Sequence, residues 1–275
     1  MENYGCSFVE AKVFGKVNLA LNIAGRAKNG YHYIDSIFAK VSCYDSVLVC
    51  KRDDDTFNIT YKNGENFKND VVLKACVAIK KEYGTRGADI VIEKGIPLSS
   101  GLGGSSASAA GVIRCLEELY NFKATNKFMQ TIGSDVPYMH SGGLKRVQGF
   151  GEVVTAINNN PPYIAVIIDK NIQINTAKCF EMYDKIGGDS ANIDGFLKEY
   201  KSPINSLQRA SVALDNRIDT LIELCTKSGF KNVVMSGSGG GVVAYDINED
   251  NFNLALNNLR QMVKKQNINH QIITN

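Results

Sequence analysis

Hydrophobic and polar residues alternate near the start of the chain, and this period of two predicts a β-strand from Val13 to Ile23. The apolar positions share one face of the strand, whereas Lys16, Asn18 and Asn22 share the other. Lys16 and Asn18 should therefore stand about 6.5 Å apart along that face. The pattern alone favours a solvent-exposed outer face for them, because antiparallel sheets commonly leave one side in water.

Apolar residues in the rest of the chain follow either strand or helix spacing. Short strands are predicted at 36–42, 46–51, 57–61, 89–93, 163–168, 232–235 and 242–245. Helical spacing predicts helices at 69–83, 109–120, 176–183, 216–227 and 252–263. Runs of strands with helices on one side indicate an α+β fold, not a doubly wound parallel sheet.

One segment has the composition of a domain boundary. Three asparagines at 158–160 precede Pro161 and Pro162, so the segment is polar and then stiffened by two proline rings. We therefore expect two domains, at 1–157 and 158–275. No internal repeat or low-complexity region interrupts either part.

The most distinctive stretch is a glycine- and serine-rich loop between the predicted strand at 89–93 and the helix that follows it. Eight of the eleven residues from Ser99 to Ala109 are Gly or Ser. Glycines let backbone N–H groups approach a ligand closely, and a helix N-terminus favours an anion. A turn that only packs a strand against a helix is the alternative. No Gly-Lys-Ser/Thr closes the loop, so it is not a Walker A motif. The loop predicts a phosphate cradle of another kind, with Ser105, Ser106 and Ser108 able to cap the helix or touch a phosphate.

Two turns carry side chains that are able to do chemistry. The segment Lys28–His32 brings a tyrosine and an imidazole together. In Gly133–Tyr138, Pro137 disfavours a helical conformation for the residue before it, so Asp135 lies where a helix gives way to a new element. From pattern alone, such a histidine is a surface residue and such an aspartate is a cap or turn residue.

Bulk composition narrows the class of protein. The chain has 275 residues, 44% of them hydrophobic, and a net charge of only +3 with basic and acidic residues interspersed. A sizeable core is therefore expected, and nucleic acid is excluded as the main partner. Seven dispersed cysteines without a CxxC pair favour reduced thiols over disulfides or a zinc site. Because the chain shows neither a signal peptide nor an apolar run of membrane-spanning length, we expect a cytoplasmic protein without a membrane partner.

Three motifs together resemble the GHMP kinase superfamily over essentially the whole chain. They are a basic residue on an early strand within Phe14–Leu19, the glycine loop Pro97–Ala107, and a late glycine loop, Ser236–Gly241, which in that superfamily packs near the phosphates. Two sharper motifs, Gly30–His32 and Gly133–Pro137, resemble the 4-diphosphocytidyl-2-C-methyl-D-erythritol kinases of the non-mevalonate isoprenoid pathway.

The resemblance implies a two-domain GHMP kinase fold, with an ATP-binding domain, a substrate-binding domain and a deep cleft between them. It implies transfer of the γ-phosphoryl group of ATP to the 2-hydroxyl of 4-diphosphocytidyl-2-C-methyl-D-erythritol. Mg²⁺ is expected with ATP, held mostly by phosphates and water, and no protein ligand is assigned to it. The partners are then small molecules, and the protein is expected to be a monomer or weak homodimer.

Carried over by position, Asp135 is the base that faces the acceptor hydroxyl, and Lys16 is its neighbour. A lysine beside an aspartate keeps the carboxylate ionised and neutralises charge on the transferred phosphoryl group. The resemblance assigns ATP binding to Pro97, Ser99, Ser100, Gly101, Leu102, Gly103, Gly104, Ser105, Ser106 and Ala107. It assigns substrate binding to Asn18, Tyr31, His32, Thr176 and Phe180, with Tyr31 and His32 in a cytosine pocket and Phe180 as its opposite wall, and phosphate proximity to Gly237, Ser238 and Gly239.

The chain departs from the usual pattern of these kinases in three places. The usual loop GLGGGSSDAA has Ser105, Ala107 and Ser108 in place of glycine, serine and aspartate. Gly15 replaces an alanine, and the stretch 121–132 is short. A GHMP kinase of the homoserine or mevalonate type and a catalytically inert nucleotide-binding protein are therefore the alternatives. A cytosine pocket argues against the first, and retention of both Lys16 and Asp135 argues against the second.

Overall fold

The computed structural model describes residues 7–62, 64, 67, 70–265 and 270–275. Its strands are β1 (Phe8–Arg26), β2 (His32–Lys51), β3 (Phe57–Tyr61), β4 (Ala88–Glu93), β5 (Lys145–Gly149), β6 (Val153–Ala156), β7 (Tyr163–Asp169), β8 (Asn232–Ser236), β9 (Gly241–Asp246) and β10 (His270–Thr274). Its helices are α1 (Val71–Tyr83), α2 (Gly104–Tyr120), α3 (Asn126–Ile132), α4 (Val136–Ser141), α5 (Thr176–Ile186), α6 (Ile193–Glu199), α7 (Gln208–Leu214), α8 (Arg217–Lys227) and α9 (Glu249–Lys265). The five helices predicted from spacing are confirmed, although residue 69, the predicted start of the first, lies outside the described residues. The short helices α3, α4, α6 and α7 were not predicted.

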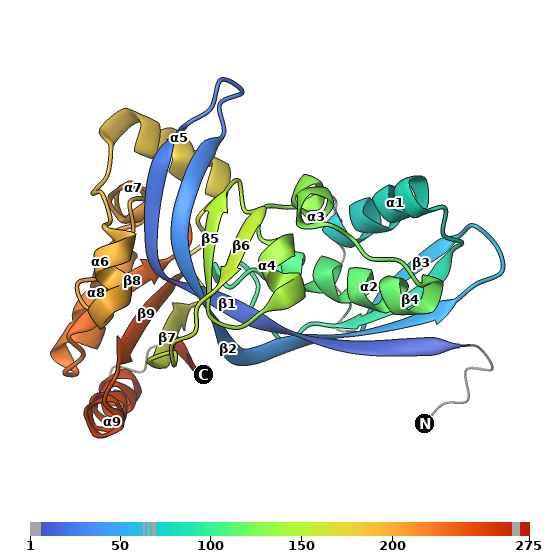
Figure 1. The fold of residues 1–275 in the computed structure, drawn as a ribbon. Coiled ribbons are helices and arrows are strands. Elements are labelled where there is room, and N and C mark those ends of the chain that lie inside the picture. The colour runs from blue at the N-terminus through green and yellow to red at the C-terminus, as the bar shows by residue number, and fades with distance from the viewer. Residues whose placement is uncertain (1–6, 63, 65–66, 68–69, 266–269) are drawn as a thin grey trace.

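A six-stranded sheet forms the first half of the molecule, in the order β3-β4-β2-β5-β6 with β1 paired to β2. Within it only β3 and β4 are parallel. β1 and β2 make a long hairpin whose tip lies beside α5 (Figure 1). The two short strands predicted at 36–42 and 46–51 are one strand, β2. The prediction of a break was wrong because Tyr44 and Asp45 continue the pairing with β1, where a bulge near Gly15 absorbs the irregularity.

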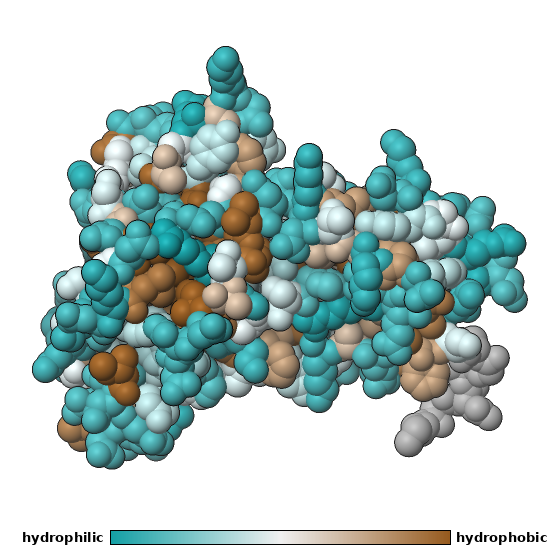
Figure 2. All heavy atoms as spheres, viewed as in Figure 1, coloured by the Kyte–Doolittle hydropathy of each residue, from teal (hydrophilic) through white to brown (hydrophobic). Residues whose placement is uncertain are grey.

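A four-stranded antiparallel sheet, in the order β10-β7-β9-β8, forms the second half and carries α8 and α9. All of its strands follow residue 157, and all strands of the larger sheet precede it. The domain limits of 1–157 and 158–275 nevertheless stay a prediction. Figure 2 shows hydrophilic residues over most of one face, with apolar residues mainly where the smaller sheet lies. Among the described helices, none combines the length and apolarity that crossing a membrane requires.

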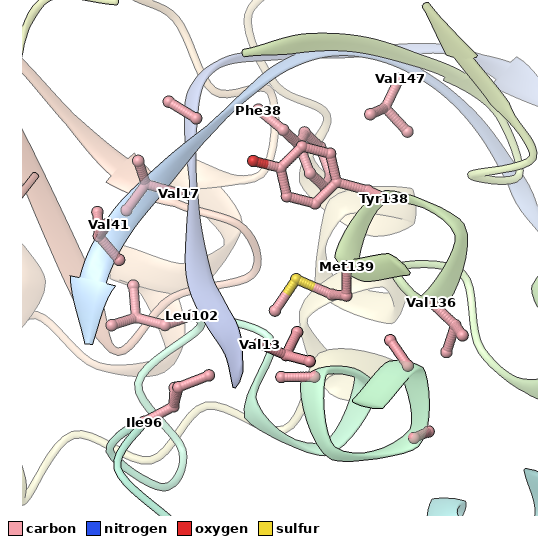
Figure 3. Packing of buried hydrophobic residues seen from close by; sticks show 14 of the residues in the cluster. Val13, Val17, Phe38, Val41, Ile96, Leu102, Val136, Tyr138, Met139 and Val147 are labelled. Atoms are coloured by element: carbon pink, nitrogen blue, oxygen red, sulfur yellow. The ribbon is translucent and has the colours of Figure 1, made fainter. Parts of the chain in front are cut away.

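The larger hydrophobic core lies between the six-stranded sheet and α2, and α1 and α4 pack on α2. Figure 3 shows Ile96 and Leu102, from the two ends of the early glycine loop, pointing into this core beside Val13 and Val17. Burying these two side chains anchors the loop, because removing a leucine or isoleucine side chain from water is favourable by roughly 1.5–3 kcal/mol. The loop therefore has fixed ends and a polar, glycine-rich middle.

The middle of β1 is buried on both faces, which overturns the exposure expected from alternation. Lys16 is only 4% exposed and Asn18 only 1%. The Lys16 backbone N–H donates to the Leu102 carbonyl at 3.0 Å, and the Asn18 N–H donates to the Ser236 hydroxyl at 3.2 Å. Both glycine loops thus cover the polar face of β1, and a strand that reads as half-exposed lies between the two halves of the protein.

Candidate active site

A cleft of about 1050 Å³ contains almost every residue that the sequence singled out. Its walls come from β1, the tip of the β1–β2 hairpin, both glycine loops, the start of α4, and α5. Of the predicted site residues only Ala107 does not line it, because Ala107 is fully buried behind the first turn of α2. Segments from distant parts of the chain therefore meet around one cavity.

The early glycine loop presents a helix N-terminus to this cleft. Gly101 and Gly103 have φ of 75° and 78°, in the left-handed region, and α2 begins directly afterwards at Gly104. No side chain of the described residues caps the helix, so its first N–H groups are available to an anion. Ser105 and Ser106 line the cleft, but Ser108 does not. The expectation that Ser108 caps the helix or touches a phosphate is therefore wrong.

Ser108 belongs instead to a buried ion-pair network behind the loop, which sequence reasoning missed. The Ser108 hydroxyl donates to Asp45 at 2.8 Å, and the Lys94 ammonium pairs with the same carboxylate. Lys94 also donates to the Gly104 carbonyl at 2.8 Å, while Asp45 accepts the backbone N–H of Ile96 at 3.0 Å. This network fastens both ends of the glycine loop to β2. In the sequence, the feature that could have indicated this network is Lys94, a lysine between the predicted strand at 89–93 and the glycine loop.

The late glycine loop packs directly on the early one, backbone against backbone. A Cβ atom on Gly240 would lie 2.3 Å from the Ser99 carbonyl oxygen, and one on Gly101 would lie 2.6 Å from the carbonyl oxygen of Gly239. Real Cβ atoms do not approach so closely, so glycine is required at both positions. The buried amide of Asn205 holds the late loop by donating to the Met235 and Gly237 carbonyls, at 2.7 and 2.8 Å.

Lys16 and Asp135 meet where these two loops face α4. The Lys16 ammonium lies 3.4 Å from the Asp135 carboxylate, donates to the Asn18 amide oxygen at 2.8 Å, and lies 4.7 Å above the Phe38 ring. Asn18 in turn donates to the Ser36 hydroxyl at 2.9 Å. The almost wholly buried Lys16 therefore places a positive charge at the cleft wall, opposite the Asp135 carboxylate, which is 29% exposed.

Asp135 occupies the N-cap position of α4, but its side chain makes no capping bond and is directed to Lys16 instead. The short stretch before it still forms a helix, α3, whose last carbonyls accept hydrogen bonds from Lys74. Burial and the neighbouring Asp135 carboxylate raise the pKa of Tyr138 well above its usual range. Because Tyr138 stays a neutral phenol, donating to the Gly143 carbonyl at 2.6 Å, it does not compete with Asp135 as a proton acceptor.

The far end of the cleft is built from aromatic side chains. His32 stacks on Phe180 with ring centroids 5.0 Å apart and an interplanar angle of 23°. These two rings touch, so no base fits between them, and the prediction that His32 faces Phe180 across an open pocket is wrong. Binding of a base between Tyr31 and Phe180 stays a prediction. Tyr31 is 67% exposed and has an edge contact with Phe150. Asp184, which accepts from His32 at 2.7 Å, was not singled out in the sequence.

Hydrogen bonds connect this aromatic end to the late glycine loop. The Thr176 hydroxyl, at the start of α5, lies 2.9 Å from the Ser238 hydroxyl. The Ser211 hydroxyl donates to the Ser238 carbonyl at 2.7 Å and lies 2.9 Å from the Cys179 sulfur. The helix that carries Phe180 is therefore fastened to the late glycine loop, which packs against the early one.

The donor set of the cleft fits a magnesium ion that arrives with its own ligands. Within the described residues no group of three or more His, Cys, Asp or Glu side chains is able to hold a metal ion. Ser105, Ser106 and Asp135 nevertheless line the cleft beside the α2 N-terminus. Mg²⁺ typically keeps several waters and takes only one or two carboxylates besides substrate phosphates, which suits this sparse arrangement.

Comparison with known proteins gives consistent results. The family pattern described as GHMP kinases N terminal domain matches residues 70–144. A Streptococcus agalactiae protein provisionally named 4-diphosphocytidyl-2-C-methyl-D-erythritol kinase is 32% identical over 272 residues, covering 92% of this chain and 95% of its own. The 4-diphosphocytidyl-2-C-methyl-D-erythritol kinase of Clostridium beijerinckii is 28% identical over 252 residues, covering 86% and 90%.

Solved structures show the same fold. A crystal structure of 4-(cytidine 5'-diphospho)-2C-methyl-D-erythritol kinase superimposes with a TM-score of 0.76 at 24% identity, covering 97% of this chain and 98% of the other. Homoserine kinase from Cytophaga hutchinsonii superimposes with a TM-score of 0.68 at 16% identity, covering 96% and 94%. The expectation of an α+β, two-domain GHMP kinase fold is confirmed.

Proposed function

This chain belongs to the 4-diphosphocytidyl-2-C-methyl-D-erythritol kinase family of GHMP kinases, and from that premise we propose how its own residues perform the transfer. The reaction moves the γ-phosphoryl group of ATP to the 2-hydroxyl of 4-diphosphocytidyl-2-C-methyl-D-erythritol. The observation that carries the proposal is the 3.4 Å contact between Lys16 and Asp135, inside a cleft that has a glycine-rich helix N-terminus at one end and stacked rings at the other.

The early glycine loop binds the ATP phosphates. Its uncapped N–H groups and the α2 dipole, equivalent to roughly half a positive charge, attract the anionic tail. Gly101 and Gly103 leave the backbone free of Cβ atoms where the phosphates approach. The late loop supports this cradle from behind, since it packs against the carbonyls of Ser99 and Ser100.

Asp135 accepts the proton of the acceptor hydroxyl, and Lys16 stabilises charge on the transferred phosphoryl group. Phosphoryl transfer depends mainly on alignment and electrostatic stabilisation. Lys16 suits that role because Asn18 and Phe38 fix its ammonium in a buried position. A preorganised charge of this kind needs no rearrangement at the moment of transfer.

The aromatic end anchors the cytosine of the substrate between Tyr31 and Phe180. Stacking a base on aromatic side chains is favourable by about 1–3 kcal/mol per base. Holding the remote end of the substrate orients its far hydroxyl toward Asp135, which converts binding energy into alignment. Mg²⁺ arriving with ATP would supply charge neutralisation at the phosphates, and Ser105, Ser106 and Asp135 are the protein oxygens lining the cleft that would hold it.

The free cysteine thiols indicate the cellular compartment of the enzyme. Among the described cysteines, Cys43, Cys76, Cys115, Cys179 and Cys225 are free thiols. Reduced cysteines persist in the cytosol, and the substrates of this family are small metabolites. We therefore place the enzyme in the cytoplasm.

The test is Asp135→Asn, which keeps the size of the side chain and removes its basicity. We expect turnover of the cytidyl substrate to fall by roughly 10²–10⁴, with ATP affinity unchanged in a titration, because loss of a general base slows only the chemical step. Asp54→Asn is the matched control, since Asp54 pairs with Arg52 at the surface, away from the cleft.

Two outcomes contradict the proposal. Unchanged turnover in Asp135→Asn removes this carboxylate from the mechanism. ATP consumption by the wild-type protein with homoserine or mevalonate, but not with the cytidyl substrate, refutes the assigned acceptor.

A further inference from the structure

We propose that Arg114 is a positioning residue, which sets the place of Asp135 relative to Lys16 by binding the last carbonyls of α4 and the backbone of β1 at the same time. Arg114 lies within α2 and does not line the cleft, so it acts on the reaction only through other residues. This inference rests on the proposed function, because Asp135 and Lys16 are the residues assigned there to the transfer.

The hydrogen bonds of the Arg114 guanidinium all go to backbone carbonyls. Its Nε donates to the His140 carbonyl at 2.8 Å, and one terminal nitrogen donates to the same oxygen and, at 3.4 Å, to the Met139 carbonyl. The other terminal nitrogen donates to the Lys12 carbonyl at 3.3 Å. Within the described part of the chain no carboxylate forms an ion pair with Arg114. The contacts of this arginine therefore fix backbone positions in α4 and β1.

The bonds at the end of α4 act on Asp135 through a single short helix. The last carbonyls of a helix have no partner within it, and a cationic side chain satisfies them. α4 runs from Val136 to Ser141 with Asp135 as its N-cap, and the Met139 N–H donates to the Asp135 carbonyl at 2.9 Å. Met139 is therefore bonded to Arg114 through its carbonyl and to Asp135 through its amide. A displacement at the C-terminal end of so short a helix also displaces its first residue.

The bond to Lys12 connects the same guanidinium to the strand that carries Lys16. Lys12 and Lys16 both belong to β1, and both pair with β2, so this part of the strand is held in the sheet. α2 itself begins at Gly104, where the phosphates are proposed to bind. One helix therefore carries the proposed phosphate site at its start and, farther along, the arginine that joins β1 to α4.

The connection that precedes α4 is held without the help of Arg114. Lys74 on α1 donates to the last two carbonyls of α3, at 2.7 and 2.9 Å. The Ser134 carbonyl packs against Gly151 so closely that a Cβ atom there would lie 2.0 Å from its oxygen. Loss of Arg114 should therefore let the far end of α4 move while its near end stays anchored. We expect a change in the geometry of the catalytic pair, not loss of the fold.

The kinetic experiment uses Arg114→Met, which keeps an apolar stem and loses every donor. We expect kcat for the cytidyl substrate to fall roughly 10- to 100-fold, because a misplacement of about 1 Å costs up to that much. The KM values for both substrates should stay close to wild type. Arg114→Lys, whose ammonium cannot span α4 and β1 together, should give an intermediate kcat. Arg146→Met is the matched control, since Arg146 is a partly buried arginine that bonds to Asp35 and Asp194 outside the cleft, and it should keep the wild-type kcat.

A double-mutant cycle separates positioning from general support of the fold. Added to Asp135→Asn, the substitution Arg114→Met should lower kcat by less than about threefold, because a side chain that cannot accept the proton loses little when it is misplaced. A merely structural role would lower kcat by the same factor in both backgrounds. Denaturant unfolding checks that each variant is folded at the assay temperature.

The structural experiment measures the position of Asp135 without reference to activity. In a crystal structure of Arg114→Met we expect the contact between the Lys16 ammonium and the Asp135 carboxylate to lengthen from 3.4 Å to more than about 4 Å, the limit for an ion pair. The Arg146→Met control should keep the contact of the wild-type protein. If Arg114→Met does not fold, the same measurements are made on Arg114→Lys and judged in the same way.

Failure of this inference is distinguishable from failure of the proposed function. An unchanged contact between Lys16 and Asp135, a wild-type kcat in the Arg114 variant, or equal factors in the two backgrounds of the cycle each overturn the role of Arg114. Absence of phosphoryl transfer to the cytidyl substrate by the wild-type protein, together with a lengthened contact in the Arg114 variant, overturns only the assigned reaction.

Discussion

The two ends of the cleft are built from different parts of the polypeptide. At the end proposed to bind phosphates, here the phosphate end, the backbones of two glycine loops pack against each other, with Gly240 over Ser99 and Gly101 over Gly239. At the end proposed to bind the base, here the nucleobase end, the contacts are made by side chains, chiefly the stack of His32 on Phe180. A phosphate tail is recognised by backbone N–H groups that any sequence supplies, whereas a base is recognised by particular rings and hydrogen-bonding groups.

The two ends of the cleft therefore differ in how they tolerate amino-acid substitutions. Backbone packing leaves no room for a Cβ atom. A substitution at the phosphate end therefore changes the conformation of the loop and, with it, the binding of the ligand. Side chains at the nucleobase end project from the β1–β2 hairpin and α5, whose backbones do not depend on them. A substitution there therefore changes affinity or specificity while the backbone keeps its conformation. Lys16 and Asp135 lie between the two ends and belong to neither.

The largest effect is expected from Gly240→Ala, which disrupts the packing of the late glycine loop on the early one. The new Cβ would lie 2.3 Å from the Ser99 carbonyl oxygen at a φ of 95°. We expect a loss of roughly 2–5 kcal/mol in the free energy of unfolding, together with loss of ATP binding. Gly84→Ala is the control, because its φ is 67° but nothing lies within 4 Å. Denaturant unfolding and ATP titration measure both, and equal destabilisation of the two variants would show that loop packing is not responsible.

The next effect is expected at the junction, from Lys16→Met, which keeps the length and packing of the side chain but removes its charge. Turnover should fall by roughly 10²–10³ while ATP still binds, since a preorganised charge acts mainly in the transition state. The matched control is Lys40→Met, because Lys40 also lies 4.7 Å above a ring, that of Phe14, but outside the cleft. Steady-state kinetics separate the two, and a variant that changes only KM would assign Lys16 to binding alone.

A smaller effect is expected at the nucleobase end, from Phe180→Leu. Loss of stacking should raise the KM for the cytidyl substrate by roughly 5- to 100-fold, with the KM for ATP and the stability little changed. Phe122→Leu removes another stacked ring, 4.2 Å from Tyr83, and should leave both constants as they are. The reverse pattern in Phe180→Leu, a raised KM for ATP alone, would mean that the two ends are misassigned.

The smallest effect is expected from Thr176→Val, which removes one hydrogen bond between α5 and the late glycine loop. The variant loses the hydrogen bond to the Ser238 hydroxyl, a loss of about 0.5–1.5 kcal/mol. We expect a few-fold rise in the KM for the cytidyl substrate, because α5 is held less firmly against the late loop. Thr226→Val, whose hydroxyl bonds only within α8, is the control. Kinetics identical to wild type in Thr176→Val would show that the ends act independently.

Sequence reasoning succeeded where residue type limits the local backbone. The glycine loops were found because Gly101, Gly103 and Gly240 adopt positive φ values that other residues adopt only with strain. The helices were found because their apolar faces recur at the helical period. Short segments such as α6 and α7 escaped, since seven residues carry too little periodicity.

The resemblance named the residues that meet in the proposed catalytic site, whereas their local pattern predicted neither their burial nor their meeting. Alternation favoured exposure for Lys16 and Asn18, and both are buried, because the glycine loops of two distant segments close over β1. Ser108 looked like part of the phosphate loop, yet it belongs to the buried pair of Asp45 and Lys94. In each case the burial depends on a partner far away in the chain, which a local window does not contain.

Residue types and their spacing predicted the longer helices, most of the strands, the two glycine loops and, through resemblance, the kinase family. Only the tertiary structure decided which polar groups meet. His32 and Asp184 are 152 positions apart, and Asn18 meets Ser236 across 218. Local conformation follows from the sterics of each residue and its neighbours, whereas such meetings depend on how two sheets and their covering helices pack into one body. That packing places a buried ammonium, a partly exposed carboxylate and a stacked imidazole around a single cleft.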